Sequence, residues 1–93
     1  MLDDYDMGAV FQALGNASRR RMLDIVKSKP GIRVGTLASE FDVSRIAVMK
    51  HLAGLEDANL IVSEKDGRTR RLYFNAAPIQ MIHDRWTTEY SAY

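Results

Sequence analysis

The residues best suited to binding chemistry fall in two short basic segments of the 93-residue chain. The first, residues 44–51, contributes a hydroxyl, a guanidinium, an ammonium and an imidazole group. The second, residues 65–71, carries four cations against one carboxylate. Guanidinium groups pair with guanine edges or phosphates, and ammonium and hydroxyl donors meet phosphates. Two such segments together indicate contact with double-stranded DNA.

The first segment has the properties of a helix that reads base edges. Ser44 is suited to cap it, and the apolar positions 48, 52 and 55 repeat at helical spacing and turn inward. Arg45 is then expected to donate two hydrogen bonds to the edge of a guanine, and Ile46 or Ala47 is expected to contact a thymine methyl group. His51 is expected to donate to a phosphate or a base. The residues of this helix expected to contact DNA are Ser44, Arg45, Ile46, Ala47, Met49, Lys50 and His51.

The second segment is predicted to be a β-hairpin with arginines at or near its tip. Asp66-Gly67 is a strong hairpin signal, and β-branched and aromatic runs flank it. Arg68 and Arg71 are expected to enter the minor groove or meet phosphates. Arg70 shares a strand face with apolar residues, so its stem is expected to be partly structural. The alternative is that one of these arginines only shields a sheet edge.

These two segments need a framework of helices to position them. Two short helices joined by few residues form a helix-turn-helix pattern, and Thr36 and Ser39 at the start of its first helix are expected to contact phosphate. The fold class is therefore mainly α with a small β-hairpin (α+β), a winged helix-turn-helix in the order α-α-α-α-β-β-α. Residues 1–93 are expected to form one such DNA-binding domain. The predicted helices span 5–15, 17–28, 36–42, 44–58 and 78–92, and the hairpin spans 60–74.

The first and last helices, 5–15 and 78–92, are predicted to be dimerisation elements. Both carry apolar stripes at helical spacing, and a winged core of this size covers only part of them. A homodimer would place its two recognition helices about one DNA turn, ~34 Å, apart on a near-palindromic site. The alternative is that both stripes pack within one chain. The predicted interface residues are Met7, Val10, Phe11, Leu14, Ile79, Ile82, Trp86 and Tyr90.

Three stretches resemble the ArsR/SmtB-type bacterial transcriptional regulators. They are the segments 13–23 and 37–52, which includes the string Val43-Ser44-Arg45-Ile46-Ala47-Val48-Met49-Lys50-His51-Leu52, and the hairpin residues 66–71. The likeness extends from about Phe11 to Tyr90. It implies a winged helix-turn-helix regulator, a repressor that binds DNA as a homodimer. Met49 departs from the family, which often has a small polar residue there, and this either weakens one direct hydrogen-bond contact or shifts the sequence preference toward apolar readout.

The resemblance also raises the question of a metal signal, and no metal or other cofactor is predicted. The cysteine pair of the family's third-helix site is absent, because the chain has no cysteine. The last helix offers His83, Asp84 and Glu89, but neighbouring helical side chains point about 100° apart and chelate poorly. The inducing signal and the operator sequence are not predicted from these residues.

Composition excludes several other classes. The net charge is only +1, but the chain begins with acidic residues and carries two basic clusters. The distribution of charge indicates the kind of partner better than the net charge does. The absence of cysteine, of a signal-peptide pattern and of a membrane-length apolar run indicates a cytoplasmic protein with no membrane partner. Phosphate-binding loops, nucleophile motifs and paired catalytic carboxylates are absent, so no enzyme is predicted. The rival class is a winged-helix protein-interaction module, which would keep the apolar stripes but would not need basic residues on both the recognition helix and the wing.

Overall fold

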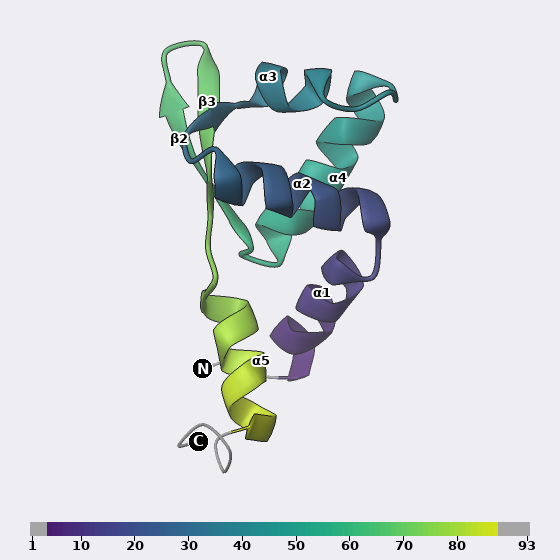
Figure 1. Cartoon of the computed structure of the whole chain (residues 1–93), viewed down its shortest axis with the longest axis vertical. Coiled ribbons are helices and arrows are strands. Elements are labelled where there is room, and N and C mark those ends of the chain that lie inside the picture. The colour runs from purple at the N-terminus through teal and green to yellow at the C-terminus, as the bar shows by residue number, and fades with distance from the viewer. Residues whose placement is uncertain (1–3, 88–93) are drawn as a thin grey trace.

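The computed structural model describes the backbone of residues 4–87 and the side chains of residues 7–87. The helices lie around one small antiparallel sheet, and the long axis of the molecule runs from the hairpin tip to the last helix (Figure 1). In chain order the described elements are α1 (Asp4–Leu14), α2 (Ala17–Ser28), β1 (Ile32–Arg33), α3 (Val34–Ser39), α4 (Arg45–Asp57), β2 (Ile61–Asp66), β3 (Thr69–Phe74) and α5 (Ala77–Thr87).

Side-chain caps fix where the helices begin. The Asn16 side chain accepts a hydrogen bond from the Arg19 backbone N–H at 3.1 Å and starts α2. The Ser44 hydroxyl accepts one from the Ala47 N–H at 3.1 Å and starts α4. These bonds satisfy amide groups that have no partner within the helix. The prediction that Ser44 caps α4 is confirmed, and Asn16 caps α2 in the same way.

The end of α4 is as well defined as its start. Asn59 adopts a positive φ of 60°, which asparagine tolerates better than most residues. The Leu60 N–H then donates to the Leu55 carbonyl at 2.9 Å, and the Asn59 N–H donates to the Glu56 carbonyl at 3.0 Å. This pair of bonds is the Schellman arrangement, which stops the helix and turns the chain directly into β2. The predicted end at residues 58–59 is confirmed.

Helix α3 differs from its prediction. It begins at Val34, two residues before Thr36, and ends at Ser39 rather than at residue 42. The chain enters it straight from β1, and Arg33 at the capping position provides no side-chain hydrogen bond. The expectation that Ser39 lies at the start of this helix is therefore wrong, because Ser39 is its last residue.

The sheet has three strands in the order β1-β3-β2, where the sequence predicts only the β2–β3 hairpin. Strand β1 is two residues long and pairs Ile32 with Leu72 on β3. The Gly31 N–H donates to the Leu72 carbonyl at 2.8 Å, and Gly31 adopts a φ of +83°, a conformation that costs glycine little. A two-residue strand has too few residues for an alternating pattern, so periodicity alone does not reveal it.

The hairpin turn is centred one residue later than the Asp-Gly signal implies. Asp66 and Thr69 face each other as the last pair of the ladder, so Gly67 and Arg68 form the two-residue connection. Gly67 has a φ of +64° and Arg68 does not have positive φ. Glycine at the first central position is typical of type II′ hairpins. The shift places Arg68 at the tip of the hairpin. We call the hairpin formed by β2 and β3 the wing.

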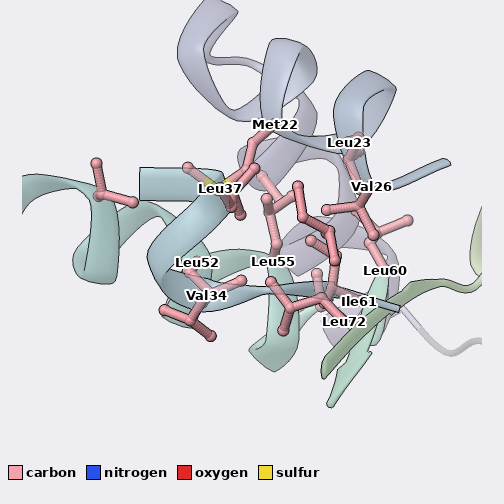
Figure 2. Packing of buried hydrophobic residues seen from close by; sticks show 14 of the residues in the cluster. Met22, Leu23, Val26, Val34, Leu37, Leu52, Leu55, Leu60, Ile61 and Leu72 are labelled. Carbon is pink, nitrogen blue, oxygen red and sulfur yellow. The ribbon is translucent and has the colours of Figure 1, made fainter. Parts of the chain in front are cut away.

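One hydrophobic core joins the helices to the sheet (Figure 2). Leu37 of α3, Leu52 and Leu55 of α4 and Leu72 of β3 all meet there with no exposed surface. Each side chain of this size contributes about 1.5–3 kcal/mol of transfer free energy when fully buried. This packing fixes α3 and α4 against each other, and therefore sets which side of α4 remains open. The other fully buried large side chains are Met22, Leu60, Ile61, Val10, Val26 and Val48.

Two residues of the predicted dimer interface, Met7 and Val10 on α1, are buried within the monomer. Val10 has no exposed surface and Met7 retains only 8%, because the inner face of α1 packs on α2 and α4 of its own chain. These two residues belong to the monomer core. Leu14, Ile79 and Ile82 are half-buried against the same core. Phe11 and Trp86 remain about half exposed, at 49% and 57%, and Tyr90 lies outside the described residues.

Candidate nucleic-acid interface

The side of α4 that faces away from the core forms one continuous surface. We call it the outer face and define it by the five residues that line a shallow groove of about 500 Å³: Arg45, Ile46, Met49, Lys50 and Ala53. Val48, Leu52 and Leu55 are buried on the opposite side, so the helix cannot rotate without exposing its core face. Among the described residues, no hydrogen bond or ion pair holds the Arg45 guanidinium or the Lys50 ammonium.

Two other residues of the predicted recognition helix are already engaged. The Ser44 hydroxyl accepts the capping hydrogen bond from Ala47. His51 is half-buried, and its Nδ1 lies 3.4 Å from Nη1 of Arg19 on α2. A side chain that points toward α2 is turned away from the outer face. The structure therefore separates His51 from Arg45, Ile46, Met49 and Lys50, with which the sequence groups it.

The two predicted contact residues of α3, Thr36 and Ser39, differ in whether the side-chain hydroxyl already donates a hydrogen bond. The Ser39 hydroxyl donates to the Thr36 carbonyl at 2.6 Å, which satisfies its hydrogen inside the helix. Ser39 also sits at the carboxyl end of α3, where the helix dipole disfavours an anion. Thr36 is exposed in the middle of the helix, and its hydroxyl remains the better donor of the two.

The three wing arginines have different surroundings. Arg68 is exposed at the tip, and no described residue forms a hydrogen bond or ion pair with its side chain. Arg71 donates to the Asp66 carboxylate at 2.6 Å and to the Gly31 carbonyl at 3.1 Å. Arg70 donates to Oε1 of Glu56 on α4 at 3.0 Å. Arg70 and Arg71 thus hold the wing to the rest of the fold, and Arg68 is available to a partner.

Asp66 is the electrostatic centre of the wing base. Its carboxylate accepts a hydrogen bond from Arg71 and forms an ion pair with Arg33 at 3.5 Å. The hydrogen bond from Arg71 and then its charge hold the pKa of Asp66 below the ordinary aspartate value, with a smaller contribution from Arg33. Sequence reasoning did not select Arg33, because its role depends on the pairing of β1 with β3. No local pattern marks that pairing.

Three cations without described hydrogen-bond or ion-pair partners, Arg45, Lys50 and Arg68, lie on the outer face of α4 and at the wing tip. In Figure 1 the wing tip, α3 and the start of α4 lie at the end opposite α5. The molecule measures 45 × 21 × 21 Å along its principal axes, so this end and the α1–α5 end are well separated. One end is thus polar and basic, and the other carries the exposed rings of Phe11 and Trp86, whose centroids are 6.5 Å apart. Met81 of α5 adds a further exposed apolar side chain there.

The described residues form neither a metal-binding cluster nor a helix that could span a membrane. Within residues 4–87, no group of three or more His, Asp or Glu side chains is placed to hold a metal ion. His83 and Asp84 contact each other at 3.2 Å, and Glu89 lies outside the described part of the chain. None of the helices in the described range is long and apolar enough to cross a membrane.

Comparison with known proteins agrees with this geometry. A helix-turn-helix domain family model matches residues 14–64, which include α2, α3, α4 and the start of β2. The chain is 36% identical over 84 residues to the HTH-type transcriptional regulator YuzN of Bacillus subtilis, covering 84% of this chain and 91% of that protein. It is 28% identical over 74 residues to the transcriptional repressor SdpR of the same organism, covering 80% of this chain and 81% of that protein.

Among solved structures, the crystal structure of an ArsR family transcriptional regulator matches with a TM-score of 0.82 and 31% sequence identity. The match covers 95% of this chain and 89% of that chain, and therefore includes the terminal helices as well as the winged core. Sequence family, relatives and fold agree, and they describe a non-enzymatic class of protein whose partner is DNA. The chain belongs to the ArsR/SmtB-type family of winged helix-turn-helix, DNA-binding transcriptional regulators.

Proposed function

We propose that the protein is a sequence-specific repressor that binds a near-palindromic operator as a homodimer, with α4 in the major groove. The observation that supports this most directly is that Arg45 and Lys50 on the outer face of α4 and Arg68 at the wing tip have no hydrogen-bond or ion-pair partner among the described residues. Cations with free donors on a recognition helix and on a wing complement base edges and phosphates. In a bacterial cell this proposal places the protein in the cytoplasm.

The proposed contacts are of two kinds: some residues recognise bases, and others bind the sugar-phosphate backbone of the DNA. Arg45 lies in the first turn of α4, where recognition helices meet base edges, so we assign it to a guanine. Arg68 at the wing tip is assigned to the minor groove or to phosphates, and Lys50 and Thr36 to phosphates. The remaining predicted contact residues are given a structural role, because their side chains already make contacts within the chain or are partly buried. They are Ser44, Ala47, Ser39, His51, Arg70 and Arg71.

A homodimer is supported by the exposed apolar surface at the α1–α5 end. Phe11, Met81 and Trp86 expose 41–57% of their surface on two neighbouring helices. Aromatic and methionine side chains are enriched at the centres of protein interfaces. The repressor assignment is supported by similarity to SdpR, a protein named as a transcriptional repressor.

The proposal is tested by DNA binding across a salt series. A duplex would be selected by the protein from a random library, and its binding measured by fluorescence anisotropy beside a scrambled duplex. Binding driven by phosphate contacts weakens steeply as salt rises. If selection enriches no sequence and no binding occurs at low salt, the proposal fails and the protein-interaction module is favoured.

The assignment of Arg45 and Arg68 gives a sharper prediction. Arg45→Ala should reduce the preference for the selected duplex by about 10-fold or more, because it removes a base contact. Arg68→Ala should weaken both duplexes equally and reduce the salt slope by about one. Lys27→Ala is the matched control, because Lys27 is an exposed cation of α2 in a groove next to Ile79 of α5. If Arg45→Ala and Arg68→Ala reduced the preference for the selected duplex over the scrambled duplex by the same factor, the assignment would be contradicted.

A further inference from the structure

The outer face of α4 carries apolar residues that remain open to solvent, Ile46 and Ala53. Ile46 exposes 76% of its surface, the largest value among the large hydrophobic residues described. Met49 and Ala53 lie beside it at helical spacing and line the same groove. Single exposed apolar residues are common on protein surfaces, but here the exposed Ile46 and Ala53 and the half-buried Met49, which also packs on the core, share one stripe between two cations. A stripe flanked by Arg45 and Lys50 faces an anionic partner, and that partner must also offer apolar surface.

The outer face lacks the groups that read adenine and cytosine by hydrogen bonds. Adenine is read in the major groove by asparagine or glutamine amides, and cytosine by carboxylates. The five residues of the outer face contain none of these groups. The nearby Ser44 hydroxyl is engaged at the cap, and His51 points toward Arg19. The outer face therefore offers cationic donors and apolar side chains, and it lacks the amide and carboxylate groups that read adenine and cytosine.

The apolar group that DNA presents in the major groove is the C5-methyl of thymine. We propose that Ile46 and Met49 select thymine methyl groups beside a guanine read by Arg45. This inference rests on the proposed function, in that α4 must enter the major groove. The two side chains are three residues apart on one face of the helix, so their Cβ atoms are about 5–6 Å from each other. At ~3.4 Å per base pair, they reach methyl groups on the same or on neighbouring base pairs.

The test removes the methyl group and changes little else. In the selected duplex, each thymine of one half-site would be replaced in turn by deoxyuridine, which keeps base pairing but lacks the C5-methyl. Burial of one such group corresponds to about a fourfold change in affinity. We expect about fourfold weaker binding at one or two neighbouring thymines and unchanged binding at the others.

Variants assign the effect to the two side chains. The double variant Ile46→Ala/Met49→Ala should bind the thymine and uracil duplexes equally at those positions. Val62→Ala is the matched control, because Val62 is a half-exposed β-branched residue of β2, and it should keep the fourfold difference. Ile46 has little buried surface to lose, so its single variant should retain the fold, as thermal unfolding would check.

Two outcomes would overturn the inference. One is equal binding of thymine and uracil duplexes by the native protein, and the other is a preference for thymine that survives in the double variant. Both require selective, salt-sensitive DNA binding to be present, so they leave the proposed function standing. Absence of selective binding to any duplex would instead defeat the proposed function itself.

Discussion

At the scale of single residues, the arginines differ through their partners and not through their chemistry. Arg71 is bound to Asp66 and to the Gly31 carbonyl, whereas Arg68, three residues earlier, has no described partner. Arg21 donates to the Glu40 carbonyl and lies 4.8 Å from the centre of the Phe41 ring. A basic cluster therefore contains both structural and available cations, and the available ones are the candidates for DNA contact.

The ion pair at the base of the wing predicts a pH dependence. The pKa of Asp66 is lowered in the fold, so the charged carboxylate stabilises the native state above about pH 4, and this stabilisation is lost as pH falls through the lowered pKa. An NMR titration of the Asp66 carboxyl should have its midpoint below the ordinary aspartate value. Arg71→Gln should move the midpoint upward. An unchanged midpoint in that variant would contradict the assigned cause.

At the scale of elements, Arg19 connects α1, α2 and α4. Its Nε donates to the Ala13 carbonyl at 2.8 Å and its Nη2 to the Gln12 carbonyl at 2.9 Å. These carbonyls belong to the last turn of α1 and have no partner within that helix. The Nη1 of Arg19 also lies next to His51 of α4. One side chain thus joins the end of a terminal helix to the middle of the recognition helix.

The loss of this connection should be measurable as stability. Arg19→Ala should lower the free energy of unfolding by about 1–2 kcal/mol, because two charged hydrogen bonds to carbonyls at the end of α1 are removed. Urea unfolding followed by circular dichroism would measure the change. Lys27→Ala on the same helix serves as the control and should alter stability by less than about 0.5 kcal/mol. Equal changes in both variants would show that Arg19 has no special role.

At the scale of the whole molecule, the two ends are chemically different. The wing and the start of α4 form a basic end, and α1 and α5 form an end with exposed aromatic rings (Figure 1). The Cα radius of gyration is 14.3 Å, above the ~12 Å expected of a compact domain of this length. An elongated monomer with an apolar end fits pairing through that end, with the basic ends directed toward DNA.

The proposed pairing predicts a change of oligomeric state. Phe11→Glu and Trp86→Glu should each raise the dimer dissociation constant about 30-fold or more, because they place a charge at the centre of an apolar interface. Analytical ultracentrifugation would measure the constant, with Val62→Glu as a control of matched exposure on β2. A native chain that sediments as a monomer, or a dimer indifferent to both substitutions, would contradict the proposed interface.

Local signals were sufficient for most of the elements. Asn16 and Ser44 act as caps through bonds that span only three residues, and Asn59 ends α4 through its own backbone preference. The apolar spacing of α4 also determined which side is buried, and thereby the outer face. Each of these features depends on neighbours within about one helical turn, so the order of residues is enough to predict it.

Tertiary structure decided the features that depend on distant partners. The contact between Arg71 and Gly31 spans 40 residues, and that between Arg19 and His51 spans 32. Strand β1 exists because β3 pairs with it, and Val10 is core because α2 and α4 cover it. The sequence determined which helices form and which cations the chain carries. Only packing decided which of those cations are held within the fold and which remain available to DNA, because partners such as Gly31 for Arg71, Glu56 for Arg70 and His51 for Arg19 come from distant parts of the chain.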